Sequence, residues 1–154
     1  MPMPTPSAGH SRLECLVGSW RGQERIHPSP MAPAGGKAVG RVHNVRALDG
    51  FAVVQSYEQE RDGGVNFRGH GVFRFDPARD RHVLHWFDSL GGPPVEFHGR
   101  FEGDTLTLVH EGPQGSVRAS WDLSEPTRYS YRMDVSPDGR TWAPFMEGTY
   151  TREA

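Results

Sequence analysis

Eight histidines are the first residues of this chain that invite a chemical role, because imidazole serves both as a metal ligand and as a general base. Two ligands on a single β-strand must be two residues apart to share a face. The only such pair on a predicted strand is Glu96 with His98, whereas His82 and His85 fall on opposite faces. It stays open whether His70, His85 and His98, from three separate strands, lie close enough in the fold to bind one metal ion. We expect no metal site.

The chain also lacks the sequence signatures of nucleophilic catalysis and of nucleotide binding. It contains no Gly-x-Ser-x-Gly elbow and no His-Glu-x-x-His zinc motif. The triplet Gly69-His70-Gly71 lacks the third glycine and the following helix of a dinucleotide fingerprint. Cys15, the only cysteine, lies among apolar residues and is expected to be a core thiol. A single cysteine forms no internal disulfide, which favours a reducing, cytoplasmic location.

The composition and charge of the chain limit the kinds of partner that we expect it to bind. The net charge is −2 and the isoelectric point is near 6.4, so we expect neither nucleic acid nor an anionic membrane as partner. No segment approaches the roughly 20 apolar residues of a membrane span. Residues 1–9 are rich in proline and small residues, which predicts a disordered tail rather than a signal peptide. Residues 10–154 are expected to form a single domain, in a monomer or a homodimer.

The elements that must position these residues are mostly strands. Ser11 and Glu14 have the spacing of a capping box and predict a short helix that ends at Gly18. From Ser19 onward, turn signals such as Asp49-Gly50 separate segments that suit β-strands. The ten predicted strands cover residues 19–27, 38–48, 51–60, 65–75, 81–89, 95–101, 105–110, 116–123, 128–135 and 142–152. Short connections make neighbouring strands antiparallel, and closure removes the free edges, so we predict an all-β, up-and-down, ten-stranded barrel.

The first and last strands of this predicted barrel carry a recognisable sequence pattern. Gly18-Ser19-Trp20-Arg21-Gly22 on the first strand and Tyr150-Thr151-Arg152 on the last are similar to the calycin pattern. The resemblance implies a lipocalin-like or fatty-acid-binding-protein-like barrel in which Trp20 and Arg152 meet at the closed end. A guanidinium that stacks on an indole stabilises such a closure, so the resemblance implies a structural role for this pair.

Further motifs extend the resemblance over nearly the whole chain after the tail. With the pattern above, they resemble a bacterial family called domain of unknown function 1579, which is calycin-like in fold. These motifs are Asp49-Gly50-Phe51, Phe67-Arg68-Gly69-His70-Gly71, Trp86-Phe87-Asp88-Ser89, Arg118 and Asp138-Gly139. The chain is also distantly similar to nitrobindins, ten-stranded barrels that bind heme through a histidine on the last strand. No histidine follows His110 here, so we expect no heme and no other cofactor.

The leading functional hypothesis is non-enzymatic binding of a small hydrophobic or amphipathic molecule in the barrel lumen. It predicts an open cavity on the order of 300 Å³ or more. The predicted ligand-binding residues are Tyr57, His70, Trp86, Asp88, Arg118, Tyr131 and Glu147. The family resemblance implies that Arg118 and Glu147 carry charge inward, although a structural pair with an acidic or basic residue is an alternative. Asp88 could equally end its strand as a turn residue.

Two other classes of function stay open. A dry lumen that holds His70, Asp88, Arg118 or Glu147 could perform acid–base chemistry such as isomerisation, cyclisation or hydration. No residue is assigned a catalytic role on the sequence alone. The other possibility is a structural or partner-binding barrel whose lumen is packed and whose outer surface does the binding.

Overall fold

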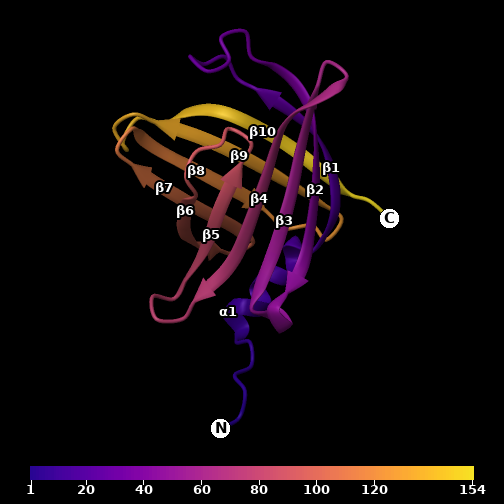
Figure 1. The fold of residues 1–154 in the computed structure, drawn as a ribbon, viewed down its shortest axis with the longest axis vertical. Coiled ribbons are helices and arrows are strands. Elements are labelled where there is room, and N and C mark those ends of the chain that lie inside the picture. Colours follow the sequence, from indigo (N-terminus) through magenta and orange to yellow (C-terminus); the bar gives the residue numbers. More distant parts are fainter.

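Turns after each apolar segment fold the chain back on itself, and each strand pairs antiparallel with its neighbour in sequence (Figure 1). The structure is a computed structural model that describes all 154 residues. The strands are β1 Gly18–Ile26, β2 Gly36–Ala47, β3 Ala52–Arg61, β4 Gly64–Asp76, β5 Arg81–Asp88, β6 Val95–Glu102, β7 Thr105–Gly112, β8 Gly115–Asp122, β9 Arg128–Ser136 and β10 Ala143–Arg152. Pairing of β1 with β10, from Trp20 opposite Arg152 to Ile26 opposite Met146, closes the barrel. The predicted ten-stranded all-β fold is therefore confirmed.

The backbone of the β2–β3 connection explains why Asp49-Gly50 predicted a hairpin here. Leu48–Gly50 form a 3₁₀ turn, η2, in which Leu48, Asp49 and Gly50 all have positive φ, at 52°, 55° and 95°. Aspartate and glycine tolerate this left-handed region, whereas leucine rarely adopts it. The turn therefore holds three residues in succession that continue neither strand, which places the hairpin where Asp49-Gly50 predicted it.

The N-terminal helix differs from its prediction. It begins earlier, as α1 Ala8–Ser11, and continues as a 3₁₀ helix, η1, over Arg12–Leu16. Ser11 is therefore inside the helical segment, and the Glu14 carboxylate pairs with Arg46 at 3.2 Å instead of capping. The prediction for Cys15 was also wrong, since this residue is exposed. None of the helical segments has the length and the apolar character that crossing a bilayer requires.

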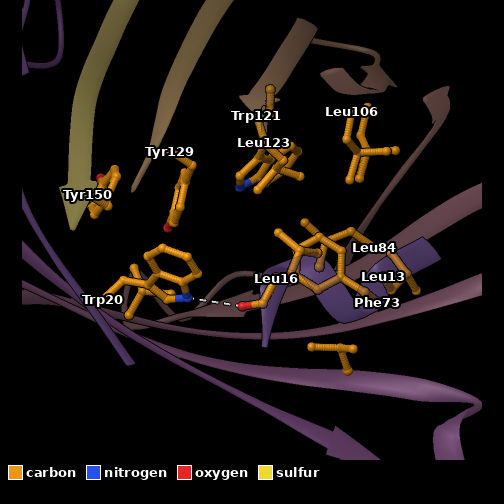
Figure 2. Close-up of a cluster of buried hydrophobic side chains, with 14 of the residues drawn as sticks. Leu13, Leu16, Trp20, Phe73, Leu84, Leu106, Trp121, Leu123, Tyr129 and Tyr150 are labelled. Carbon is orange, nitrogen blue, oxygen red and sulfur yellow. Dashed lines mark hydrogen bonds between the residues drawn. The ribbon is translucent and has the colours of Figure 1, made fainter. Parts of the chain in front are cut away.

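The helical segment closes the lower end of the barrel in Figure 1, and its two leucines lie in the core. Leu13 and Leu16 are almost fully buried with Trp20 (Figure 2). The Trp20 indole Nε1 donates to the Leu16 carbonyl at 3.0 Å, and the Asn44 side-chain amide donates to the same oxygen at 2.8 Å. These bonds satisfy a carbonyl at the end of a helix, where no intrahelical partner exists.

Arg152 covers this closed end from the last strand. Its guanidinium carbon lies 4.2 Å from the centroid of the Trp20 ring. The same guanidinium donates to the carbonyl of Val17 at 2.7 Å and to that of Pro126 at 3.0 Å. One side chain thus joins the end of η1, the β8–β9 loop and the first strand, which is the arrangement that the calycin resemblance implies.

Candidate functional site

The lumen face of each strand follows from the position of Trp20. Along β1, Trp20, Gly22, Glu24 and Ile26 are buried, while the residues between them are exposed. Because side chains alternate across a strand, these four residues face the lumen. Glu24 is the exception in chemical type, since it is a carboxylate that is 3% exposed among apolar and glycine neighbours.

The lumen has two halves that differ in packing. Near the helix, side chains such as Phe73, Leu106 and Trp121 are buried and fill the space between the strands (Figure 2). Toward the opposite end, which we call the mouth, the inward side chains are only half-buried although they pack against the same core. These mouth residues are Phe67, Trp86, Val95, Val117 and Tyr131, from β4, β5, β6, β8 and β9.

Two glycines make room for the largest of these side chains. Gly69 and Gly71 lie opposite Asp88 and Trp86 on the adjacent strand. A Cβ atom on Gly69 would overlap the Trp86 ring, and one on Gly71 would lie 2.8 Å from a Leu84 methyl group. The glycines therefore allow the indole to lie flat against β4 inside the barrel.

Below the mouth, the Glu24 carboxylate accepts hydrogen bonds from three side chains of the lumen. The Tyr57 hydroxyl lies 2.8 and 2.9 Å from the two carboxylate oxygens, and the Tyr150 hydroxyl donates to one of them. The Gln59 amide nitrogen donates at 3.0 Å. Asn66 in turn donates to the Gln59 carbonyl oxygen at 3.0 Å, which fixes the orientation of that amide. Three side chains thus direct their donors toward a single acidic group, and Asn66 supports one of them.

Glycines on three strands create the space for this cluster. A Cβ atom on Gly40 would overlap the Glu24 carboxylate, and one on Gly22 would overlap the Tyr150 ring. A Cβ atom on Gly148 would lie 2.9 Å from the same ring. The second glycine of the Gly-x-Trp-x-Gly motif thus has a steric role, because the ring of Tyr150 occupies the place of its missing side chain.

No cation neutralises Glu24. It takes part in none of the ion pairs of the structure, all of which join N and O atoms within 4.0 Å. Burial, and then the charge of Glu24, raise the pKa of the Tyr57 phenol far above its usual value. The same two causes raise the pKa of Tyr131 and that of Tyr150. The charge of Glu24 also contributes to the raised pKa of Tyr129, so the carboxylate acts electrostatically on all four phenols of the lumen.

Four of the seven predicted site residues lie on the inner side of the barrel. Tyr57 belongs to the Glu24 cluster, and Tyr131 and Trp86 lie at the mouth. Asp88 ends β5 at the rim, where it accepts from the Trp86 indole at 3.0 Å and from the Leu90 backbone N–H at 3.0 Å. This contact fits the alternative of a turn residue at the end of the strand.

The other three predicted residues point outward. His70 is exposed on the outer face of β4. Arg118 pairs with Asp134 at 3.4 Å and lies 4.3 Å from the Trp142 ring centroid, on the outer side of β8. Glu147 lies 3.7 Å from the imidazole of His27 and its side chain is 43% exposed. The expectation that Arg118 and Glu147 carry charge into the lumen was wrong, because their strand neighbours Ala119 and Met146 occupy the inner face.

Glu24 is the residue that the sequence analysis missed. Its position offered a signal, since it lies four residues after Trp20 on a strand and must share its face. An acidic residue on the same strand face as a buried tryptophan is uncommon, because a buried carboxylate requires hydrogen-bond partners. Those partners come from β3 and β10, and no local pattern connects them to β1.

Two hollows lie mainly outside the barrel. One of about 900 Å³ is lined by residues of six neighbouring strands, mostly outward side chains such as Gln23, Arg132 and Thr149, and it also touches Glu24 and Tyr131. Another of about 380 Å³ lies between the β7–β8 hairpin and the β9–β10 connection. Neither hollow is lined mainly by inward side chains, and core side chains fill most of the half of the lumen next to the helix. Partly exposed inward side chains gather at the mouth, and Phe101 is partly exposed at the closed end.

The histidines do not gather. His70 and His85 are on the outer face, and His85 accepts from the Arg74 guanidinium at 2.9 Å. His82 is buried at the closed end, 2.8 Å from the Gly9 carbonyl. The structure has no group of three or more His, Cys, Asp or Glu side chains arranged to hold a metal ion.

Comparisons with known proteins agree with this architecture. A family model described as "Protein of unknown function (DUF1579)" matches residues 5–152. The fold is similar to that of Rv2717c from M. tuberculosis, with a TM-score of 0.73 and 15% identity over 96% of this chain and 99% of that chain. It is also similar to the S-type phycobiliprotein lyase CPES from Guillardia theta, with a TM-score of 0.63 and 13% identity over 97% and 99% of the two chains. Among curated proteins, no sequence match is found.

Proposed function

We propose that this chain, which belongs to the family described as "Protein of unknown function (DUF1579)", binds a small amphipathic molecule non-covalently at the mouth of its lumen. The observation that carries the proposal is the half-exposed state of the inward aromatic side chains at the mouth. Apolar surface inside a concave mouth is wetted at a cost of about 25 cal/mol per Å², and an apolar ligand body that covers it recovers that free energy.

The polar side of the site supports an amphipathic rather than a purely apolar ligand. The Tyr131 hydroxyl takes part in none of the side-chain hydrogen bonds of the structure, whereas the neighbouring Tyr57 hydroxyl donates to Glu24. Below it, Gln59 and Tyr57 are buried, with 8% and 9% of their surface exposed. A few polar groups among aromatic walls are typical of pockets that orient a ligand. The likeness to a phycobiliprotein lyase supports the architecture alone, and the binding proposal depends on these side chains.

A neutral fluorescent amphiphile tests this function. N-pentyl dansylamide, which carries no charge, is expected to bind with enhanced, blue-shifted emission as its ring enters the aromatic mouth. The variant Phe67→Gln, at an inward and half-buried position, is expected to weaken binding by about tenfold, since loss of a buried aromatic contact costs roughly 1.5 kcal/mol. His70→Gln, on the outer face of the same strand, is the matched control and should bind like the wild type.

Circular dichroism and thermal melts establish that both variants are folded before their binding is compared. Absence of probe binding by the wild type would overturn the proposal. Equal binding by Phe67→Gln and the wild type would also overturn it, because the probe would then occupy another surface, such as the outer hollow.

A further inference from the structure

We propose that the mouth of the lumen selects ligands whose polar end is a cationic nitrogen with N–H donors and discriminates against anionic amphiphiles. This inference rests on the proposed function and adds the chemical class of the ligand. It reverses the polarity expected from an inward Arg118, which would have suited a carboxylate ligand.

The carboxylates Glu24 and Asp88 belong to the lumen, and the imidazole of His110 also faces inward, from β7, where it lies 2.9 Å from the Glu96 carbonyl. Glu24 is buried below the mouth, next to the apolar cluster of Ile26, Ala38 and Met146, and Asp88 lies at the rim. Basic side chains on the inward side lie at the ends of the barrel instead: Arg152 covers Trp20 at the closed end, and Arg46 pairs there with Glu14. At the mouth, Arg61 extends from the end of β3 and donates to the Gly35 carbonyl in the β1–β2 loop at 2.9 Å. No lysine or arginine lies between these ends.

The Glu24 carboxylate has acceptor capacity left. Two ionised oxygens offer about four lone-pair positions, and a phenol supplies a single proton. Tyr57 and Tyr150 supply one donor each, and Gln59 directs one N–H to the carboxylate, with Tyr57 and Met146 close to the same nitrogen at 3.2 and 3.5 Å. Three donors thus face about four acceptor positions, and none of them carries a compensating charge. A ligand N⁺–H supplies both a donor and that charge, and charge-assisted bonds are the stronger ones.

The aromatic walls suit the same ligand class. The half-buried rings of Phe67, Trp86 and Tyr131 present π faces, which attract cations and repel anions. Tyr131 lies on β9 opposite Gly148, which in turn lies opposite Glu24 on β1, so this ring is the mouth side chain nearest the carboxylate along the sheet. A cation between these rings and Glu24 interacts favourably with both. An anion at this position is repelled by both.

The side chains of Gln59 and Met146, near Glu24, are flexible. Gln59, which donates to the carboxylate, contacts Met146 at 3.5 Å, and Met146 packs with Ile26 and Ala38. Both side chains are unbranched and flexible, and a thioether tolerates repacking better than a branched or aromatic group. A ligand nitrogen therefore reaches the carboxylate only when Met146 or Gln59 moves aside.

A matched set of probes tests the charge preference. Dansylcadaverine ends in an ammonium, N-dansyl-6-aminohexanoate ends in a carboxylate, and N-pentyl dansylamide is neutral, with the same fluorophore and a similar chain. The wild type is expected to bind the ammonium probe at least about tenfold more tightly than the carboxylate probe, with the neutral probe between them. This comparison needs no variant and decides the preference by itself.

Variants then locate its origin. Glu24→Gln keeps the shape and removes the charge, so the ammonium-to-carboxylate ratio should fall to less than about threefold. Glu147→Gln removes a carboxylate from the outer face of β10 and should leave the ratio unchanged. Tyr57→Phe keeps the Glu24 charge and removes one of its donors, so the preference should persist or increase.

Each outcome is decisive. Failure of all three probes to bind the wild type would overturn both the proposed function and this inference. Equal binding of the three probes would overturn the inference while the proposed function stands. A preference that survives in folded Glu24→Gln, or disappears in Tyr57→Phe, would show that Glu24 is not its source.

Discussion

Alkaline pH is the perturbation that tests the interior of this barrel most directly. The chain has four tyrosines, Tyr57, Tyr129, Tyr131 and Tyr150, and all of them face the lumen. Desolvation by burial is the largest cause that raises the pKa of each phenol. The chain has a single lysine, Lys37, so few other groups titrate in the same range. The behaviour of the protein above pH 10 therefore reports mainly on the lumen.

The sign of the effect follows from linkage. An unfolded phenol ionises near pH 10, whereas the folded protein keeps it protonated, so the folded state binds more protons and loses stability as the pH rises. One phenol that stays protonated contributes a loss of about 1.4 kcal/mol by pH 11. Four phenols together cost about 5–6 kcal/mol, which is comparable to the whole free energy of unfolding of a small domain. We therefore expect cooperative unfolding near pH 11 rather than gradual titration.

Tyrosinate absorbance in the near ultraviolet and far-UV circular dichroism, followed over the same alkaline titration, check this expectation. The two signals should change together, in a transition steeper than that of a single proton. In concentrated guanidinium chloride the phenols should titrate independently near pH 10. Ionisation of the tyrosines near pH 10 with the circular dichroism unchanged would refute the argument, because it would place the phenols in contact with water.

Substitutions at Tyr57 and Gly69 extend these predictions to single contacts. Tyr57→Phe removes a donor from the buried Glu24 carboxylate and should lower the free energy of unfolding by about 1.5–3 kcal/mol in urea titrations. The control is Tyr129→Phe, which removes a hydroxyl that makes no hydrogen bond and should change the free energy of unfolding by less than about 0.5 kcal/mol. Equal effects of the two variants would contradict the proposed network. Gly69→Val would force the new side chain into the Trp86 ring, so it should lower the free energy of unfolding by about 1–3 kcal/mol and shift the tryptophan emission. Unchanged stability and emission would refute this close approach.

The barrel could be predicted because its determinants are local. Turn residues at Asp49-Gly50 and at similar positions end each strand, and short connections force antiparallel neighbours. The helix start was missed because Ser11 and Glu14 form a plausible cap on their own. In the folded chain, Gly9 packs against Phe75 and its carbonyl lies 2.8 Å from His82, and these contacts with distant strands extend the helical segment toward the N-terminus.

The site could be predicted only in part, because strand periodicity fixes which residues share a face but not which face is inside. Tyr57 and Trp86 were selected for their chemistry and lie inward, whereas Arg118 was expected inward from a resemblance and lies outward. The parity of β8 decides this, since Trp121, three residues after Arg118, is buried in the core. Residues an odd number of positions apart on a regular strand take opposite faces. An unambiguous core tryptophan on each strand is therefore a better guide to orientation than charge.

The Glu24 cluster is difficult to explain as a device for stability. A buried carboxylate without a cation carries a desolvation penalty of several kcal/mol, and its hydrogen bonds offset only part of it. The cluster also requires Gly22, Gly40 and Gly148 on three strands, and glycine in a strand interior weakens the strand. Well-packed apolar residues of the same volume would serve a purely structural barrel at least as well. A chain that keeps both costs below an aromatic mouth fits the recognition proposed above, in which the ligand supplies the positive charge that the protein lacks.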